Sequence, residues 1–283
     1  MGLEEQLAFC AVAPLGDRPP AVQRALLTEL CRGPEGVLDR VEGDARLLAV
    51  LVERITTASG AAILEPMAAT VGASPPALAR LLAGAIDAAE ALIQGTRPLE
   101  LPLPSPLAAL EPTLTARGFR LSHVVYDMGT APRHPPPARP PLPDGLRWEV
   151  VSEARLDALH QVTRAAFAGR PDVAFPALDD WKAMTRAAPI PPRLLLHAQQ
   201  VVGFASVGLL RPGLGQVRNI GRDPAWYGLR LGPILLAEAM HLLAEAGAER
   251  FTLSVLATNA AALRLYQDAG FEIEREERVF FRG

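Results

Sequence analysis

The sequence predicts an α/β protein in which mixed sheets are flanked by helices and the chain is divided into two halves. The first observation is length, because 283 residues are about twice a modest domain. The second is a proline-rich stretch near the middle of the chain, at residues 132–143. The third is the second half, where segments of strand-like hydrophobic patterning alternate with segments of helical period.

The composition narrows the class of protein. Hydrophobic residues make up 49% and charged residues 21%, which is an ordinary globular balance. No apolar run reaches the ~18–20 residues of a membrane span, and a net charge of -3 argues against nonspecific nucleic-acid binding. We therefore expect a cytoplasmic protein without membrane or nucleic-acid partners. Cys10 and Cys31 are expected to be buried thiols, and no metal site is predicted.

The proline-rich segment marks the expected boundary between the halves. It holds seven prolines in twelve positions. Proline lacks a backbone N–H and fixes φ near −65°, so neither a helix nor a central strand passes through. An extended spacer is expected, with a docking motif for a proline-reading partner as the alternative. The predicted division is a first domain at 1–130, a linker at 131–145 and a second domain at 146–283.

The second half predicts an ordered alternation of elements. Strand patterns lie at 146–151, 193–198, 201–210, 216–221, 251–257, 271–276 and 279–282, with Gln199 and Gln200 as a hairpin turn. Apolar residues at helical spacing predict helices at 153–168, around Trp181 and Met184, at 231–246 and at 259–269. Gly247 and Gly270 are natural ends for the last two helices.

The first half is less regular. Strands are predicted at 45–52, 61–67 and 120–128, and an edge strand at 99–103 despite its prolines. Ser74 and Pro75 are the cap and first residue of a helix that runs to Ile93. A second helix is predicted at 105–117, before Gly118 and Phe119.

One candidate site is the turn that leads into the long helix, Pro224-Ala-Trp-Tyr-Gly-Leu-Arg-Leu-Gly-Pro233. Gly228 and Gly232 let the backbone turn sharply and let a ligand approach closely. The first N–H groups of a helix have no partners within it, so they suit a phosphate or pyrophosphate. A tight turn without a ligand is the alternative.

A second candidate is the run Asn259-Ala-Ala-Ala-Leu-Arg-Leu-Tyr-Gln-Asp-Ala-Gly-Phe271. Asn259 is a good N-cap. Tyr266 lies at helical spacing from Ala262 and Ala269. Read alone, Asn259 is a plain cap and Tyr266 a half-buried core aromatic.

Together the two segments resemble the GNAT N-acetyltransferase superfamily. The turn occupies the place of that family's acyl-CoA motif, Arg/Gln-x-x-Gly-x-Gly/Ala. Residues 259–271 match its second motif, Asn-x-x-Ala-x-x-Leu-Tyr-x-x-x-Gly-Phe, at every fixed position. The resemblance covers 146–283 and implies a central mixed sheet flanked by helices.

The resemblance implies an acyl-CoA-dependent N-acyltransferase with acetyl-CoA as co-substrate. Tyr266 would be the catalytic acid that protonates the leaving thiolate. In the acyl-CoA motif, Tyr227 and Arg230 replace Arg/Gln and the first glycine, and Arg222 replaces a usual aliphatic residue. The implied cofactor-binding residues are Ile220, Arg222, Tyr227, Gly228, Leu229, Arg230, Leu231, Gly232 and Asn259.

The attacking amine must also lose a proton, and the 216–221 strand offers no carboxylate. Asp223, His197, and Ser254 acting through a water are candidate proton acceptors. Their structural alternatives are a turn residue, a polar strand residue and a sheet-face hydroxyl. An amine that arrives deprotonated needs none of them.

The first half shows a weaker echo of the second. When the Gly-Phe pairs that end the two helices are aligned, Leu114 stands in place of Tyr266 and Leu107 in place of Asn259. Prolines at 75–76 remove N–H groups that a pyrophosphate needs. We therefore expect two GNAT-like domains in tandem, the first degenerate, with an unrelated α/β domain as the alternative.

The predicted function is acetyl transfer from acetyl-CoA to an amine of a small molecule or peptide by direct attack. One rival is a non-catalytic acyl-CoA-binding sensor or scaffold. Another is an enzyme for a longer or acidic acyl-CoA, in which Arg211 or Arg218 meets a second carboxylate. The identity of the acceptor and the formation of a homodimer are left open.

Overall fold

The computed structural model of the protein describes residues 5, 6, 9, 10, 37–52, 61–95, 97–170, 173 and 175–283. The chain forms two compact units. The second unit comprises Tyr126–Arg170 and Phe175–Glu274, and the first comprises Met1–Val125, Pro171–Ala174 and Arg275–Gly283. Two strands, β5 (Arg120–Thr130) and β11 (Phe271–Arg282), each contribute residues to both units.

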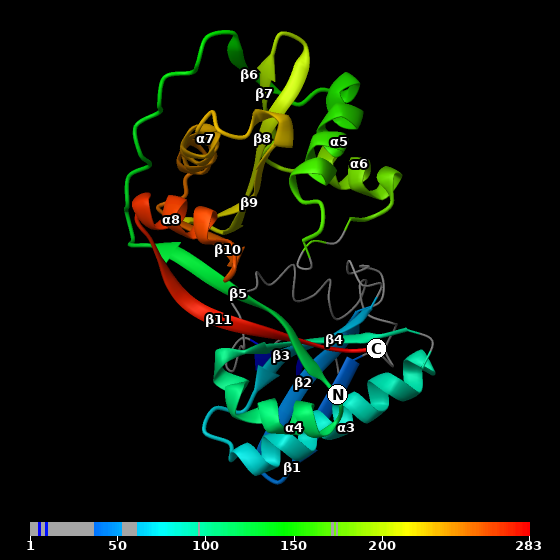
Figure 1. Cartoon of the computed structure of the whole chain (residues 1–283). Coiled ribbons are helices and arrows are strands. Elements are labelled where there is room, and N and C mark those ends of the chain that lie inside the picture. Colours follow the sequence, from blue (N-terminus) through cyan, green and yellow to red (C-terminus); the bar gives the residue numbers. More distant parts are fainter. Residues whose placement is uncertain are drawn as a thin grey trace. The chain divides into compact units, whose positions relative to one another are not determined.

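The first unit is a sheet covered by a helix (Figure 1). Its strands follow the order β1-β2-β3-β4-β11. Only β3 and β4 pair in parallel, and the other neighbours in this order are antiparallel. The bounds are β1 (Val37–Glu42), β2 (Ala45–Val52), β3 (Ala62–Ala69), β4 (Leu99–Pro104) and α3 (Pro75–Ile93).

Helix α3 begins and ends as its sequence predicts. The Ser74 side chain accepts a hydrogen bond from the Ala77 N–H, and prolines occupy the first helical positions. One face of the helix is buried and joins the core of the unit, where Leu82 and Ile86 are 0% exposed. This burial, more than helix propensity, holds a helix of this length in place.

Two expectations for the first unit are corrected, and one strand is new. Strand β4 is not an edge strand, because it pairs with β3 on one side and β11 on the other. The helix expected at 105–117 is split into η3 (Ser105–Leu110) and α4 (Glu111–Ala116), since Pro112 cannot donate the hydrogen bond that a continuous helix needs. Strand β1 was not predicted from the sequence.

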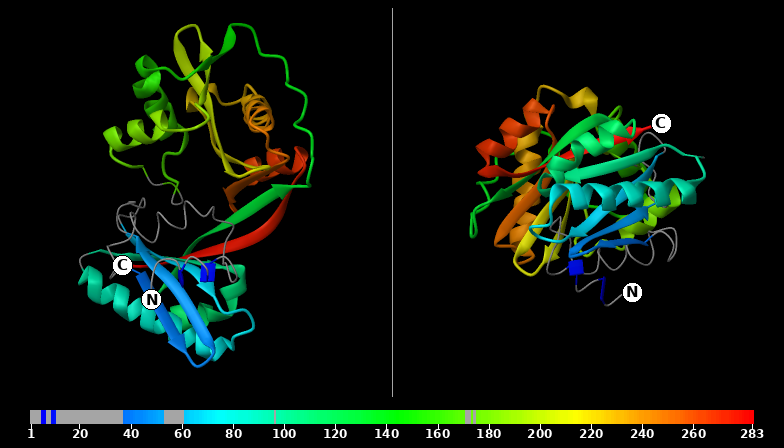
Figure 2. Two further views of the ribbon diagram at one scale, coloured as in Figure 1. Left: turned by 180° about the vertical axis from the view of Figure 1, so that it is seen from behind. Right: turned by 90° about the horizontal axis from the view of Figure 1, so that it is seen from below.

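The second unit is a mixed sheet between helices, with strand order β5-β10-β9-β8-β7-β6. Figures 1 and 2 show α5 and α6 on one side of β8 and β9, and α7 on the other. The strands are β6 (Leu146–Val150), β7 (Arg193–His197), β8 (Gln200–Arg211), β9 (Leu214–Arg222) and β10 (Arg250–Leu256). The helices are α5 (Leu156–Ala166), α6 (Leu178–Arg186), α7 (Leu231–Glu245) and α8 (Ala260–Asp268), with 3-10 turns η4 (Glu153–Arg155) and η5 (Pro224–Trp226).

Two details differ from expectation in this unit. The hairpin turn lies at Ala198 and Gln199, one residue earlier than predicted, because His197 pairs with Gln200. Ala198 supplies the positive φ, 51°, that a tight two-residue turn uses. The two strands expected at 271–276 and 279–282 form the single strand β11.

The proline-rich segment is bound to the second unit rather than free of it. Arg139 forms ion pairs with Glu238 and Glu245 of α7, at 3.0 and 2.9 Å. The Pro137 carbonyl lies 2.9 Å from His241 Nε2. An extended chain without internal hydrogen bonds leaves its carbonyls free for such partners. None of the described helices combines the length and hydropathy needed to cross a bilayer.

Of the two cysteines, Cys10 is buried among β2 and β3 residues of the first unit. Cys31 lies outside the described residues.

Candidate functional site

The candidate site lies where two parallel strands part. Strands β9 and β10 pair through three residues, and the last pair is Thr252 with Gln216. Beyond this pair β9 continues to Arg222 and β10 to Leu256. Ligands of open α/β sheets bind outside the carboxyl ends of such strands. The gap brings together the ends of β9 and β10 and the starts of the helices that follow them.

A β-bulge explains why the strands separate here. Ser206 of β8 pairs with Asn219, and Val207 pairs with Val217, so Arg218 is an extra residue in β9. A bulge bends its strand and increases its twist. Since it follows Gln216 by two positions, it turns β9 away from β10 directly after their last pair.

The turn after β9 presents the start of α7. Gly228 has φ 95° and Arg230 has φ 48°, so both take the left-handed conformation that reverses the chain. Among the described residues, no side chain caps α7, which begins at Leu231. The N–H groups of Leu231 and Gly232 are therefore available to an anion, whereas Pro233 has none to offer.

Arg222 places a cation beside these N–H groups. Its guanidinium carbon lies 4.7 Å above the Tyr227 ring, and its Nη1 is 3.9 Å from where a Cβ at Gly232 would be. Its Nε is buried and has no hydrogen-bond partner within the described part of the chain. A buried donor without a partner is costly, so this arrangement favours a bound anion.

The other predicted donor-site residues fall along the same path. Ile220 lies in β9 beyond the last pair with β10 and is half-buried. Tyr227 and Leu229 are exposed, at 58% and 51%, whereas Leu231 is fully buried. The turn thus exposes its first residues and anchors the helix start in the core.

Asn259 and Tyr266 both belong to α8. The Asn259 side chain accepts from the Ala262 N–H at 3.2 Å, so it caps the helix. At Gly232 the absence of a side chain lets Leu265 approach, since a Cβ there would be 3.1 Å from Leu265 Cδ2. This contact brings the neighbouring Tyr266 close to the start of α7.

The Tyr266 hydroxyl lies in an apolar setting. Its ring packs against the core formed by α7 and β10, with the Phe271 ring centroid 6.1 Å away. Burial raises the pKa of Tyr266, and the nearby Arg170 guanidinium partly offsets this. The hydroxyl is therefore protonated at neutral pH and can donate a proton.

Strand β10 separates two groups of side chains. Phe251, Leu253 and Val255 enter the core shared with α7 and Tyr266. Because side chains alternate along a strand, Thr252 and Ser254 lie on the opposite face, the one that carries α5 and α6. The two faces of the sheet at the gap thus carry Tyr266 on one side and Ser254 on the other.

Asp127 is a site residue that the sequence did not reveal. The Ser254 hydroxyl donates to Asp127 Oδ1 at 2.7 Å. Asp127 lies on β5, far from Ser254 in sequence, and no local pattern links the two residues. Their proximity follows from the pairing of β5 beside β10.

The other two candidate proton acceptors have structural roles. Asp223 Oδ1 accepts from the Ala225 N–H at 2.9 Å, which is the turn role that its sequence context suggested. The His197 ring packs on Trp226, with 4.9 Å between centroids.

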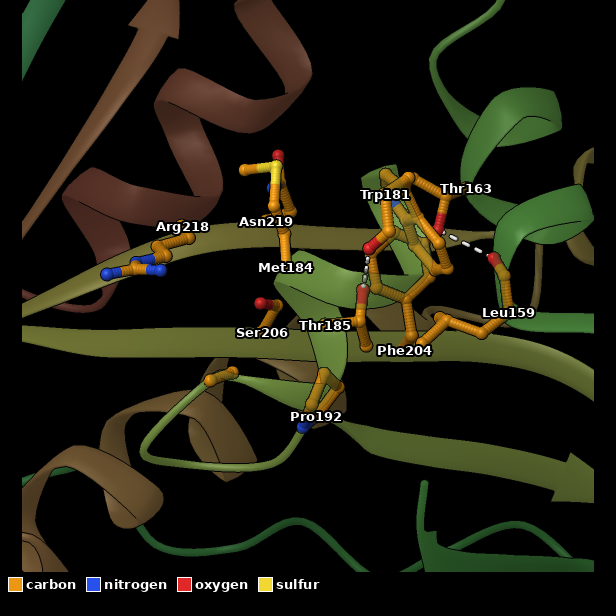
Figure 3. Close-up of a pocket in the computed structure, with 11 residues that line it drawn as sticks. Leu159, Thr163, Trp181, Met184, Thr185, Pro192, Phe204, Ser206, Arg218 and Asn219 are labelled. Carbon is orange, nitrogen blue, oxygen red and sulfur yellow. Dashed lines mark hydrogen bonds between the residues drawn. The ribbon is translucent and has the colours of Figure 1, made fainter. Parts of the chain in front are cut away.

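A cavity of about 180 Å³ opens on the α5 and α6 side of β8 and β9 (Figure 3). Of its lining residues, the sequence analysis named only Arg218 as a candidate ligand contact. Its walls come from α5, α6, β8, β9 and the loop before β7. The lining residues are Leu159, Thr163, Trp181, Met184, Thr185, Ala188, Pro192, Phe204, Ser206, Arg218 and Asn219.

The first unit has a similar strand–helix–strand order but a different interior. Strands β3 and β4 are parallel and pair through two residues. Leu107 and Leu114, which align with Asn259 and Tyr266, are buried in the core at 2% and 0% exposure. In addition, Ser74 caps α3. The positions of Leu107 and Leu114 therefore offer no polar group to a ligand.

No group of three or more His, Cys, Asp or Glu side chains among the described residues is arranged to hold a metal ion.

Comparison with known proteins identifies relatives of this architecture. The model of the acetyltransferase (GNAT) family matches residues 156–271. Mycothiol acetyltransferase of Thermomonospora curvata is 29% identical over 171 residues, which are 59% of this chain and 57% of the relative. The chain thus spans little more than half the length of that relative. Mycothiol acetyltransferase of Thermobispora bispora is 28% identical over 94% of this chain and 90% of its own length.

Among solved structures, a tandem GNAT protein from the clavulanic acid biosynthesis pathway superposes with a TM-score of 0.66 at 16% identity. The superposition covers 98% of this chain and 92% of that protein. Because the match extends over both units, it confirms the predicted tandem fold.

Proposed function

We propose that this chain is an acetyltransferase of the GNAT family, whose model matches residues 156–271, and that it transfers the acetyl group of acetyl-CoA to an amine of a small molecule. The observation that carries the proposal is the gap between β9 and β10, bordered by the uncapped start of α7 and by Tyr266. Acetyl-CoA is the donor that this family uses. The names of the two relatives make mycothiol-type amines the first acceptors to test.

The residues around the gap fit the donor. The free N–H groups at the start of α7 and the Arg222 guanidinium together suit a pyrophosphate, which carries negative charge and many acceptor oxygens. The β9 backbone from Arg218 to Arg222 is not paired with β10 and can bind the amide groups of the pantetheine arm. Bound acetyl-CoA supplies a thioester, whose carbonyl carbon an amine attacks.

Tyr266 acts as the acid in this proposal. Attack forms a C–N bond and breaks the C–S bond, and Tyr266 donates its hydroxyl proton to the departing sulfur. Its raised pKa keeps this proton in place at neutral pH. A positioned general acid contributes about 10²–10⁴ in rate.

Ser254 and Asp127 form the proton path on the other face. Because the Ser254 hydroxyl already donates to Asp127, its lone pairs are directed to accept a hydrogen bond from the amine. As the C–N bond forms, the amine proton passes to Ser254 Oγ while the serine proton passes to the Asp127 carboxylate. This pair thus takes the role of proton acceptor, because the β9 strand has no carboxylate that could take it.

The first unit has a non-catalytic role in this proposal. Its counterparts of Asn259 and Tyr266 are buried leucines, and they lack the groups that bind the donor and protonate the thiolate. We retain the division into 1–130, 131–145 and 146–283 as the functional division of the sequence.

The test is an acetylation assay on the purified full chain. Acetyl-CoA is offered with pooled amines, including mycothiol-type amines, amino acids, polyamines and peptides, and products are identified by mass spectrometry. Release of CoA together with an acetylated amine is expected. Calorimetric binding of acetyl-CoA without any acetylated product would favour the sensor or scaffold instead. Faster turnover with succinyl-CoA than with acetyl-CoA would favour a different acyl donor.

A further inference from the structure

The cavity between α5, α6 and the sheet has two chemically different ends. Trp181 and Phe204 provide an aromatic end, where Leu159 also lies (Figure 3). Ser206, Arg218 and Asn219 provide a polar end on β8 and β9, and Figure 3 shows Arg218 on the far side of the cavity from Trp181. A ligand that fills this space has an apolar body and a polar group.

The bulge in β9 creates the polar end. Neighbouring residues of a regular strand point to opposite faces, yet Arg218 and Asn219 both line this cavity. Arg218 is the extra residue of the bulge, which redirects its side chain. The guanidinium then lies where a side chain at Gly208 would be, since a Cβ there would come within 2.6 Å of Arg218 Nε.

Among the described lining residues, Arg218 is the one that carries a charge. None of the described residues that line the cavity is acidic. Within the described part of the chain, no hydrogen bond or ion pair engages the Arg218 side chain. The two threonines of the wall are already engaged, because Thr163 donates to Leu159 O at 2.7 Å and Thr185 to Trp181 O at 2.8 Å.

We infer that this cavity binds the acceptor and that Arg218 binds a carboxylate on it. The acceptor is a small amine that carries both a carboxylate and an apolar body, as an apolar amino acid does. An arginine fork matches the two oxygens of a carboxylate, and the bond is charge-assisted. The role of the amine as nucleophile rests on the proposed function, whereas the binding of the carboxylate does not.

The size of the cavity supports a small acceptor. Its volume of about 180 Å³ is below the ~300–1,000 Å³ typical of sites that enclose drug-sized ligands. Asn219 and Ser206, beside Arg218, offer further hydrogen bonds to the polar end of the same molecule. The cavity and the Ser254–Asp127 pair share one face of the sheet, so an amine bound here lies on the side where the proton is accepted.

The experiment compares matched ligands on matched variants of the full chain. Free leucine, methionine and phenylalanine are set against their amides, which keep the amine and the body but lack the carboxylate. The variants are Arg218→Gln, Arg218→Lys and, as a control, Arg264→Gln on the exposed side of α8. Binding is measured by calorimetry in the presence of CoA, and acetyl transfer from acetyl-CoA is measured separately.

For the parent chain we expect at least one free amino acid to bind and react about 10–100-fold better than its amide. Arg218→Gln should remove this difference, Arg218→Lys should retain part of it, and Arg264→Gln should leave it unchanged. Equal binding of acids and amides, or no binding of either, would overturn the inference. So would a preference that survives Arg218→Gln.

The two readouts separate this inference from the proposed function. Carboxylate binding that depends on Arg218, without acetyl transfer, keeps the inference and rejects the proposed function. Acetyl transfer that is indifferent to the carboxylate and to Arg218 keeps the proposed function and rejects the inference. If Arg218→Gln lowered the rate of acyl transfer only with succinyl-CoA as donor, Arg218 would bind the carboxylate of the acyl group. That result would also overturn the inference.

Discussion

Ser254 of β10 donates a hydrogen bond of 2.7 Å to Asp127 of β5. The two residues lie 127 positions apart in sequence, on neighbouring strands beside the gap between β9 and β10. The pair supplies a carboxylate next to the candidate site, where the β9 strand has none. It also gives the Ser254 hydroxyl a fixed orientation, with its lone pairs free for a second partner.

Ser254→Ala and Asp127→Asn should each lower kcat/KM at neutral pH, by about 10²-fold or more if the pair accepts the amine proton. The loss should shrink at alkaline pH, where more of the amine is already deprotonated. Rate against pH between pH 7 and 9.5 tests this. A loss that is constant over this range would indicate a structural role, and Ser254→Thr is the control that retains the hydroxyl.

Tyr266→Phe should reduce kcat by about 10²–10⁴ because the leaving sulfur loses its proton donor. The affinity for CoA should change little, since the ring that packs in the core is retained. Steady-state kinetics and calorimetry measure the two effects. Tyr126→Phe, in the same core, is the matched control. Unchanged kcat in Tyr266→Phe would remove this residue from the mechanism.

Arg222→Gln should weaken CoA binding by about 10–100-fold, the loss expected for a charge-assisted hydrogen bond to phosphate. The difference from the parent chain should become smaller as the salt concentration rises. Calorimetric titration with CoA at two ionic strengths measures both effects, with Arg264→Gln as control. Tight binding by Arg222→Gln would show that the helix start alone holds the pyrophosphate.

Gly270→Ala should destabilise the second unit more than Gly247→Ala. Both glycines have positive φ, 87° and 88°, so alanine costs about 1–2 kcal/mol at either position. At Gly270 a Cβ would also lie 2.5 Å from the His134 ring, whereas at Gly247 nothing lies within 4 Å. Urea unfolding of the two variants tests this.

A second variant isolates the contact with His134. Adding His134→Ala to Gly270→Ala should recover the part of the loss due to the clash, though it also removes the hydrogen-bonding contact of His134 with Ala269 O. No recovery would attribute the whole effect to backbone strain.

The His160 side chain should make stability depend on pH. It is 9% exposed, its Nε2 has no partner among the described residues, and burial, followed by Arg164, lowers its pKa. The unfolded chain takes up a proton below about pH 6.5 while the folded chain resists it, so stability falls as pH drops below this value. Thermal melting at pH 7.5 and 5.5 should show a smaller fall for His160→Phe than for the parent chain. Equal falls would contradict this role.

The sequence by itself determined the elements whose signals are local. The Ser74 cap and apolar face of α3, the Asn259 cap of α8 and the Gly-Phe pair after Tyr266 all act within a few residues. The second motif was specific enough to indicate a resemblance to the GNAT family, because its fixed residues fall within one helix and its ends. The tandem fold followed from a fainter copy of the same pattern.

Only the tertiary structure decided the contacts between distant segments. Three of these contacts depend on strand register. They are the pairing of β11 with β4, the placement of Asp127 beside Ser254, and the bulge that lets Arg218 and Asn219 line one cavity. Register arises from the packing of whole faces, and a side chain's neighbours across a sheet leave no mark in its own stretch of sequence. The helix motif could therefore be recognised before folding, whereas the Ser254–Asp127 hydrogen bond and the cavity beside β8 and β9 exist only after it.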